Sequence, residues 1–296
     1  MRTLSDALKW AEEKKIALGH FNIAGFEQFQ AIVNVARKLD LPVLIGVSEG
    51  EREYLGVRRV RDLADSVNRE FGNPDAEWGF WLFVNADHTH SIEKAKEAAA
   101  AGFDEVLFDG GKLSLEENIK KTQEAIRLAR AAHPDVVIEG ELGYIGTSSE
   151  IRTAIPEGAA IKPEDLTKPE EALRFVEVTG VDMLAPAVGN IHGMFANMPD
   201  PGLDLQRIRT IKDAVKIPLV LHGGSGNTDA DFLAAINAGI NIIHISTELR
   251  LAWRKSLERA LKENPSEIAP YKLMPGVIAA AEEVVERRLR LFSKIS

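Results

Sequence analysis

The sequence predicts a (β/α)8 TIM barrel with an additional helical region at its C-terminus. Eight apolar runs rich in β-branched residues alternate with segments whose apolar residues recur at helical spacing. The runs are apolar on both faces, as is typical of parallel strands covered by helices. A length of 296 residues suits one barrel of this kind. We therefore expect residues 1–296 to form a single barrel domain.

The predicted strands alternate with helical segments along the whole chain. The strands are residues 16–23, 42–48, 78–87, 105–110, 136–142, 183–189, 218–224 and 240–247. Residues 91–102 have the pattern of a helix, with Ser91 as its N-cap and Gly102 as its C-cap, and residues 118–132 repeat apolar residues at helical spacing. Residues 146–170 form the longest irregular stretch, and a loop of that length is commonly a lid or a binding loop. The amphipathic segment 274–292 either closes the barrel or meets a partner subunit.

The composition argues against several classes of protein. A formal net charge of −9 speaks against a broad nucleic-acid surface. Because the chain has no cysteine, it has no disulfide framework, and any metal must be held by His, Asp or Glu. The apolar runs fall short of the roughly 18 residues of a membrane span, and residues 1–15 lack a signal-peptide core. A cytoplasmic protein is the expectation.

Histidines gather where the predicted strands end. Of the seven in the chain, His88, His192, His222 and His244 lie at or just after the C-terminal ends of strands three, six, seven and eight. In this fold that end of the barrel carries the active site. Imidazoles without cysteines suit a zinc site that keeps one position open for substrate. The other three, His20, His90 and His133, are interpreted as structural.

Carboxylates follow the same distribution. Asp87 directly precedes His88, and Asp109 ends the fourth strand. Glu139 and Glu141 are two residues apart, so both side chains point to one face of the fifth strand. Carboxylates on an inward face are costly unless they are paired or bind a metal, and the nearby strand ends offer few bases. A metal or catalytic role is therefore favoured over a structural ion pair.

A glycine-rich turn follows the seventh strand, in the sequence "LHGGSGNTDADF" (221–232). Such a turn exposes backbone N–H groups and brings a helix N-terminus to the barrel mouth, a geometry that binds phosphate. Ser246 and Thr247 end the eighth strand, and the loops after strands seven and eight form the usual phosphate site of these barrels. The pattern predicts a phosphate-binding site.

These segments together resemble, in order and over nearly the whole chain, the class II, metal-dependent fructose-bisphosphate aldolases and their tagatose-bisphosphate relatives. The motifs that carry the resemblance are "GHFNI", "VNADH", "LFDGGKLSLEENI", "IEGELGYIG", "DMLAPAVGNIHGMF" and "LVLHGGSG". No single motif is decisive, whereas six in register are highly specific.

The resemblance implies a role for each matching residue. His88, His192 and His222 match the three zinc ligands, Glu141 an alternative metal-site glutamate, and Asp109 an acid near a second cation. Asp87 matches the aspartate that exchanges a proton with the substrate C4 hydroxyl. The residues that match substrate- and phosphate-binding positions are Asn22, Ser48, Gly193, Gly223, Gly224, Ser225, His244, Ser246 and Thr247. A second divalent or monovalent cation is a further candidate, and the family is generally dimeric or larger, which implies a homodimer or homotetramer.

The chain departs from the family pattern at three places. The family's loop glutamate, which acts as the C–H base, would fall at Ser149, and the nearest glutamate is Glu150. His244 stands where the family has asparagine, with Ile242 in place of a lysine. A phosphate-binding lysine after "HG" is absent, so phosphate binding must depend more on backbone amides or on a basic residue such as Arg250.

The resemblance implies zinc-dependent, reversible cleavage of fructose 1,6-bisphosphate to dihydroxyacetone phosphate and glyceraldehyde 3-phosphate. The alternatives are the same chemistry on tagatose 1,6-bisphosphate or another ketose phosphate, and a metal- and phosphate-binding relative without turnover. A Schiff-base aldolase needs a lysine on a barrel strand. The predicted strand cores contain none, since Lys112 and Lys216 lie just outside them.

Overall fold

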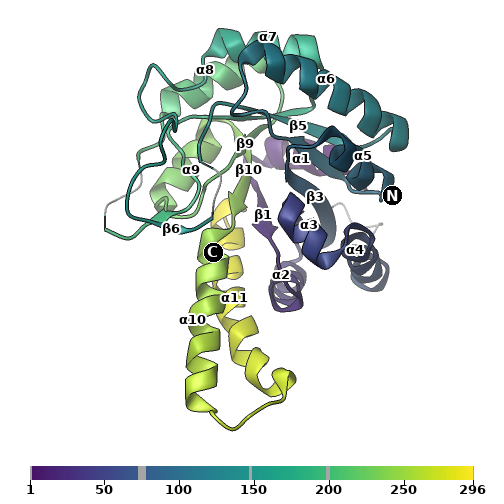
Figure 1. Ribbon diagram of the computed structural model, residues 1–296, viewed down its shortest axis with the longest axis vertical. Helices are drawn as coiled ribbons and strands as arrows, with labels where there is room; N and C mark the ends of the chain where they lie inside the picture. The colour runs from purple at the N-terminus through teal and green to yellow at the C-terminus, as the bar shows by residue number, and fades with distance from the viewer. Residues whose placement is uncertain (1, 73–77, 147–148, 198–200, 296) are drawn as a thin grey trace.

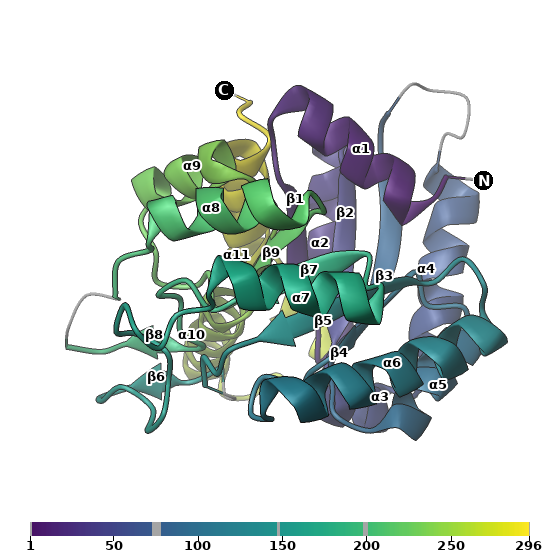
Figure 2. The same ribbon diagram turned by 90° about the horizontal axis from the view of Figure 1, so that it is seen from above.

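The computed structural model describes residues 2–72, 78–146, 149–197 and 201–295. A closed barrel of parallel strands forms its centre, in the order β1-β10-β9-β7-β5-β4-β3-β2 (Figures 1 and 2). The barrel strands are β1 (Leu18–Asn22), β2 (Pro42–Val47), β3 (Trp81–Thr89), β4 (Glu105–Phe108), β5 (Val137–Leu142), β7 (Met183–Pro186), β9 (Leu219–Leu221) and β10 (Ile240–Ile245). Each overlaps one predicted strand, and the predicted (β/α)8 barrel is confirmed. That residues 1–296 form a single domain stays a prediction.

Helices cover the outside of the barrel and follow the strands in sequence. They are α1 (Leu4–Lys14), α2 (Phe26–Leu39), α3 (Glu49–Leu55), α4 (Val57–Phe71), α5 (Ile92–Ala100), α6 (Leu115–Ala132), α7 (Pro169–Thr179), α8 (Leu205–Val215) and α9 (Asp229–Ala238). Ser91 caps α5 as predicted, accepting a hydrogen bond from the Lys94 amide. The C-cap is Ala101, one residue earlier than the predicted Gly102, which follows it with φ +86°. Glycine suits that left-handed position because it has no Cβ.

The C-terminal region is a helical hairpin that projects from the barrel, drawn in green to yellow in Figure 1. It consists of α10 (Thr247–Glu263) and α11 (Pro270–Phe292), which pack against each other. The hairpin confirms the predicted additional helical region. Helix α11 also packs against α2, where the side chain of Asn34 donates to Glu282 over 2.6 Å. A homodimer or homotetramer stays a prediction.

Two differences from the predicted elements lie near the barrel mouth. Within the predicted irregular stretch 146–170, β6 (Ile151–Arg152) pairs with β8 (Met194–Phe195) in a small separate sheet. A strand of two residues has no periodicity that a sequence pattern could reveal. The third barrel strand also runs two residues beyond its predicted end, to Thr89.

None of the helices in the described residues is long and apolar enough to cross a membrane.

The barrel interior changes from apolar to polar along its axis. At the N-terminal end, Leu18, Phe83 and Ile242 pack with residues of α1 in one buried cluster. Because side chains alternate along a strand, the next inward positions are two residues further on. Those positions hold His20, Asn85 and His244, all buried. In this barrel the inward side chains are therefore apolar at the N-terminal ends of the strands and polar toward the C-terminal ends, where the candidate site lies.

Candidate active site

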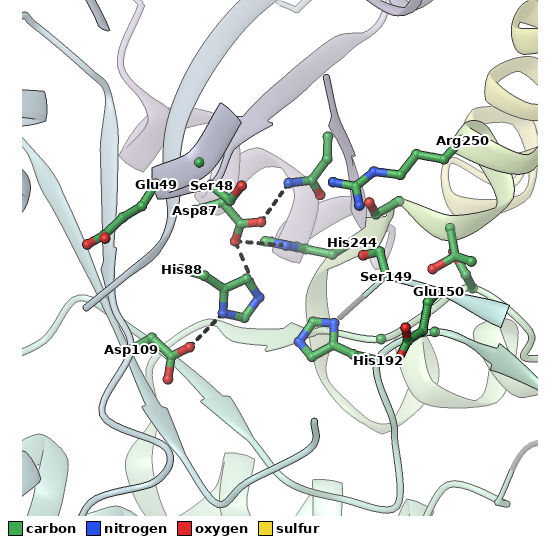
Figure 3. A pocket seen from close by; sticks show the side chains of 18 of the residues that line it. Ser48, Glu49, Asp87, His88, Asp109, Ser149, Glu150, His192, His244 and Arg250 are labelled. Atoms are coloured by element: carbon green, nitrogen blue, oxygen red, sulfur yellow. Dashed lines mark hydrogen bonds and ion pairs between the residues drawn. The ribbon is translucent and has the colours of Figure 1, made fainter. Parts of the chain in front are cut away.

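A pocket of about 530 Å3 opens at the C-terminal ends of the strands (Figure 3). It brings together residues that the sequence analysis selected from distant segments. The predicted residues that line it are Asn22, Ser48, Asp87, His88, Asp109, Glu150, His192, Gly193, Gly223, Gly224, Ser225, His244, Ser246 and Thr247. The other two, Glu141 and His222, are not among the lining residues and are buried, each contacting His88.

The end of β3 is irregular, which affects where the side chains of its last residues point. Consecutive residues of a regular strand face opposite sides of a sheet. Here the pairing of β3 with β4 shifts register between Ala86 and Thr89, and His88 adopts φ +39°. A non-glycine residue is uncommon in this left-handed region. The irregular backbone allows Asp87 and His88 to line the same pocket although they are adjacent in sequence.

Three histidine rings converge from the ends of β3 and β9 and from the segment after β7, and two of them, His88 and His192, line the pocket. Nε2 of His88 lies 3.2 Å from Nδ1 of His222. The His192 ring centroid is 4.7 Å from that of His88 and 5.8 Å from that of His222. One nitrogen of each ring lies within 4.8 Å of the others. Nε2 of His192 is buried without a hydrogen-bond partner. Three converging imidazoles, one with an unsatisfied nitrogen, fit a bound divalent metal of the zinc type.

Carboxylates surround the other nitrogen of His88. Nδ1 lies 2.8 Å from Oδ2 of Asp109 and 3.6 Å from Oε2 of Glu141. Burial alone would lower the pKa of His88, but the charges of Asp87, Asp109 and Glu141 raise it well above its ordinary value. Burial raises the pKa of Glu141. His88, Asp109 and Glu141 form a second group whose ligand atoms are close enough to hold an ion.

Asp87 is a buried carboxylate at the pocket wall. Its Oδ2 accepts a hydrogen bond of 2.7 Å from the amide of Asn22, while Oδ1 lies 3.6 Å from Nδ1 of His244. Burial alone would raise the pKa of Asp87, but His88, His20 and His222 and the Asn22 hydrogen bond lower it below its ordinary value. Asp87 is therefore ionised at neutral pH and can accept a proton.

The glycine-rich turn and the start of α10 form another part of the pocket wall. Gly223 has φ +59°, and a Cβ there would lie 2.5 Å from the carbonyl oxygen of Ile191. Ser225 Oγ accepts a hydrogen bond of 3.2 Å from the amide of Glu248, in the first turn of α10. Ser246 Oγ is buried without a partner beside the helix N-terminus. Helix N-termini and exposed backbone amides bind anions, so this wall suits a phosphate.

Glu150 and Arg250 lie at the rim. The side chain of Glu150 is 57% exposed and forms an ion pair of 3.0 Å with Arg152. Arg250 is the only arginine or lysine among the described residues that line the pocket, and it is hydrogen-bonded to Glu51. One negative group of a ligand can therefore contact a cationic side chain, and further negative charge must be met by backbone amides and hydroxyls.

The sequence did not predict that His20 pairs with His244 beneath the pocket. His20 is fully buried and stacks on His244, with ring centroids 3.4 Å apart and planes inclined by 6°. Parallel pairing of β1 with β10 aligns the two residues directly. The alternation of Leu18, His20 and Asn22 along one strand was the available signal, because it puts His20 on the same face as a predicted site residue. Arg52, which contacts the end of β3, carried no motif that would single it out.

Comparisons with known proteins identify the family of this chain. The family model "Fructose-bisphosphate aldolase class-II" matches residues 2–295. The fructose-bisphosphate aldolase of Geobacillus stearothermophilus is 33% identical over 289 residues, which cover 96% of this chain and 94% of that protein. The sulfofructosephosphate aldolase of Alkalicoccus urumqiensis is 32% identical over 288 residues, with 96% and 94% covered.

Solved structures give the same result. The YdjI aldolase from Escherichia coli K12 superposes with a TM-score of 0.78 and is 28% identical, with 99% of this chain and 97% of that chain covered. A putative fructose-1,6-biphosphate aldolase from Coccidioides immitis has a TM-score of 0.79 and 26% identity, with 98% and 95% covered. Barrel, pocket and relatives together show that this chain belongs to the class II fructose-bisphosphate aldolase family and is an enzyme, a carbon–carbon lyase.

Proposed function

We propose that this enzyme cleaves fructose 1,6-bisphosphate reversibly to dihydroxyacetone phosphate and glyceraldehyde 3-phosphate, with zinc bound by His88, His192 and His222. The observation that carries the proposal is the convergence of these three imidazoles beside the carboxylate of Asp87 in one pocket. Glu141 and Asp109 are proposed to serve the same ion in a second position, or a second cation, through their contacts with His88.

The bound metal would supply Lewis-acid stabilisation of the negative charge that develops when the C3–C4 bond breaks. Asp87 takes the proton of the C4 hydroxyl as the aldehyde forms, since it is ionised and in the pocket wall. Asn22 holds one oxygen of Asp87 and leaves the other free for this exchange. His244 contacts the same carboxylate and is proposed to hydrogen-bond the sugar chain of the substrate.

Glu150 is proposed to move the proton at C3 of dihydroxyacetone phosphate. It lines the pocket and belongs to a segment at its rim, although its carboxylate is paired with Arg152. For this role the side chain has to leave Arg152 and turn inward. Gly193, Gly223, Gly224, Ser225, Ser246 and Thr247 are proposed to bind the phosphate of the dihydroxyacetone part, and Ser48 lines the same pocket beside α3.

A second candidate substrate carries a less charged group at its far end. Because Arg250 is the only lining arginine or lysine in the described residues and is already bonded to Glu51, two phosphates are less well matched than one. The similarity to a sulfofructosephosphate aldolase makes a sulfonated fructose phosphate the specific alternative. Tagatose 1,6-bisphosphate, which differs from fructose 1,6-bisphosphate in configuration at C4, is the other. A Schiff-base route is set aside because no lysine is among the lining residues that the structure describes.

The test is a comparison of kcat/KM for these three substrates with the zinc-loaded enzyme, with triose phosphate release as the readout. The proposal predicts the highest value for fructose 1,6-bisphosphate. A value at least about tenfold higher for another ketose, which corresponds to about 1.4 kcal/mol of transition-state stabilisation, would replace the proposed substrate but not the aldol chemistry.

A further inference from the structure

The guanidinium of Arg52, a residue of α3, contacts the irregular end of β3. Nη1 donates to the carbonyl oxygen of Val47 over 2.5 Å and to that of Asp87 over 3.2 Å. Nη2 donates to Oγ1 of Thr89 over 2.8 Å. The same Thr89 hydroxyl donates to the carbonyl oxygen of Ala86 over 3.0 Å. Arg52 therefore connects the last residue of β2 with both sides of His88.

These bonds lie where the regular ladder between strands is interrupted. The register of β3 against β4 shifts between Ala86 and Thr89, and His88 has φ +39°. Backbone carbonyls in such a region need partners other than the ladder. Arg52 and the Thr89 hydroxyl supply hydrogen bonds to Asp87 and Ala86. The uncommon backbone shape that turns both Asp87 and His88 toward the pocket is thus held by side-chain contacts.

Arg52 places a buried positive charge at the end of the strand. It is 3% exposed, and its hydrogen bonds within the described residues go to neutral oxygens. Burial accordingly lowers its pKa. A buried charge without a hydrogen-bonded carboxylate carries a desolvation cost that simple packing would not require. The guanidinium presents its donors in a rigid, planar fork that spans separated acceptors, whereas the donors of a lysine all lie on one nitrogen at the end of a flexible stem.

We propose that Arg52 is a positioning residue for the aldol reaction, which fixes the end of β3 so that Asp87 and His88 face the pocket together. The proposal rests on the roles proposed above for these two residues. It goes beyond them because Arg52 does not line the pocket and acts only through the backbone and Thr89.

Arg61 offers a matched control. It is a second buried arginine, on α4, 8% exposed, and it donates to the carbonyl oxygen of Gly102 and to Asp104. It also supports the strand region around β3 and β4, because Asp104 in turn accepts from the amide of Val84. In the part of the chain that the structure describes, the hydrogen bonds and ion pairs of Arg61 go to Gly102, Asp104 and Asp65 and not to the end of β3 that carries Asp87 and His88. A merely structural arginine should behave as Arg61 does.

The experiment compares Arg52→Met, Arg52→Lys and Arg61→Met with the full-length wild-type enzyme. The readouts are zinc affinity by chelator competition, kcat and KM separately, and Tm. We expect Arg52→Met to lower kcat by about 100-fold, as a 1 Å misplacement of a catalytic group does, and to weaken zinc binding by about tenfold. Arg52→Lys should rescue only part of kcat. Arg61→Met should lower Tm and leave zinc affinity and kcat at their wild-type values, because Arg61 does not line the pocket.

Arg52→Met with zinc affinity and kcat within about twofold of wild type would overturn the proposal, as would an equal loss in Arg61→Met. Should Arg52→Met fail to fold, Thr89→Val decides, because it removes the Thr89 hydroxyl with little change of shape. We expect it to lower kcat by about tenfold, the effect of one lost hydrogen bond, and wild-type kinetics in this variant would overturn the proposal. A wild-type enzyme that binds no zinc would instead overturn the proposed metal site.

Discussion

The carboxylate of Glu139 holds the ring of His222 from inside the barrel, with Oε1 at 2.8 Å from Nε2. Both side chains are fully buried. The contact occupies Nε2 and leaves Nδ1 facing Nε2 of His88, 3.2 Å away. A carboxylate behind a histidine commonly fixes which nitrogen binds a metal and how the ring is oriented. Glu139 thus sets the geometry of the proposed metal site without lining the pocket.

Replacement of Glu139 by Ala should therefore weaken zinc binding by about 10- to 100-fold, the usual cost of losing such a partner. Glu139→Gln keeps an oxygen that can accept a hydrogen bond from His222 and should lose less. Competition with a chelator of known affinity measures both variants. Wild-type zinc affinity in Glu139→Ala would show that His222 needs no such support.

Replacement of Glu150 by Ala should slow hydrogen exchange at C3 of dihydroxyacetone phosphate by about 10²- to 10⁴-fold, the typical contribution of a general base. Exchange can be followed by NMR in deuterated water without an aldehyde substrate. Ser149→Ala distinguishes the neighbouring position. Zinc affinity should be unchanged in Glu150→Ala, since Glu150 is in none of the candidate metal groups found among the described residues. Unchanged exchange would rule out Glu150 as the base.

Gly46 provides the space for the buried ring of His20. A Cβ at this position would lie 2.1 Å from Cε1 of His20, so Gly46→Ala must displace the ring from its stack on His244. We expect a loss of about 1–3 kcal/mol in the free energy of unfolding, as for other overpacked cores. Gly276→Ala is the control, because a Cβ there meets nothing within 4 Å. Denaturant unfolding that gives equal stability for Gly46→Ala and wild type would contradict this interpretation of the stack.

The stability of the metal-free enzyme should fall on acidification. Burial lowers the pKa of His20 from 6.5 to about 3, so the folded chain keeps this ring neutral while the unfolded chain takes up a proton below pH 6.5. The stabilisation is complete above pH 6.5 and declines toward pH 3, by about 1.4 kcal/mol per pH unit for this group. His20→Asn should show a shallower decline in unfolding experiments across this range. An identical slope in both proteins would show that His20 does not contribute.

Much of the fold was predictable because several barrel strands carry apolar residues on both faces. In β2, for example, Val43, Ile45 and Val47 pack against the outer helices while Leu44 joins the cluster inside the barrel. Such a continuous apolar run is typical of a parallel strand that is covered on both faces, and it can be recognised in the amino-acid sequence alone. The end of β3 was not predictable, because a register shift and a positive φ leave no periodic signal.

The candidate site was predictable as a set of residues but not as an arrangement. His88, His192 and His222 share a strand-end position that the barrel geometry brings together. The sequence could not show that Glu139 contacts His222 while Glu141 contacts His88, since both glutamates point to one face of β5. It also could not show that Arg52 contacts Asp87, because a buried arginine on a helix has no distinguishing pattern.

The most direct test of the central claim is cleavage of fructose 1,6-bisphosphate before chelation, after chelation and with zinc restored. We expect triose phosphate release to be lost on removal of the metal and recovered with zinc, because the ion proposed to be held by His88, His192 and His222 would stabilise the developing charge. Activity that survives thorough metal removal would contradict the zinc-dependent mechanism.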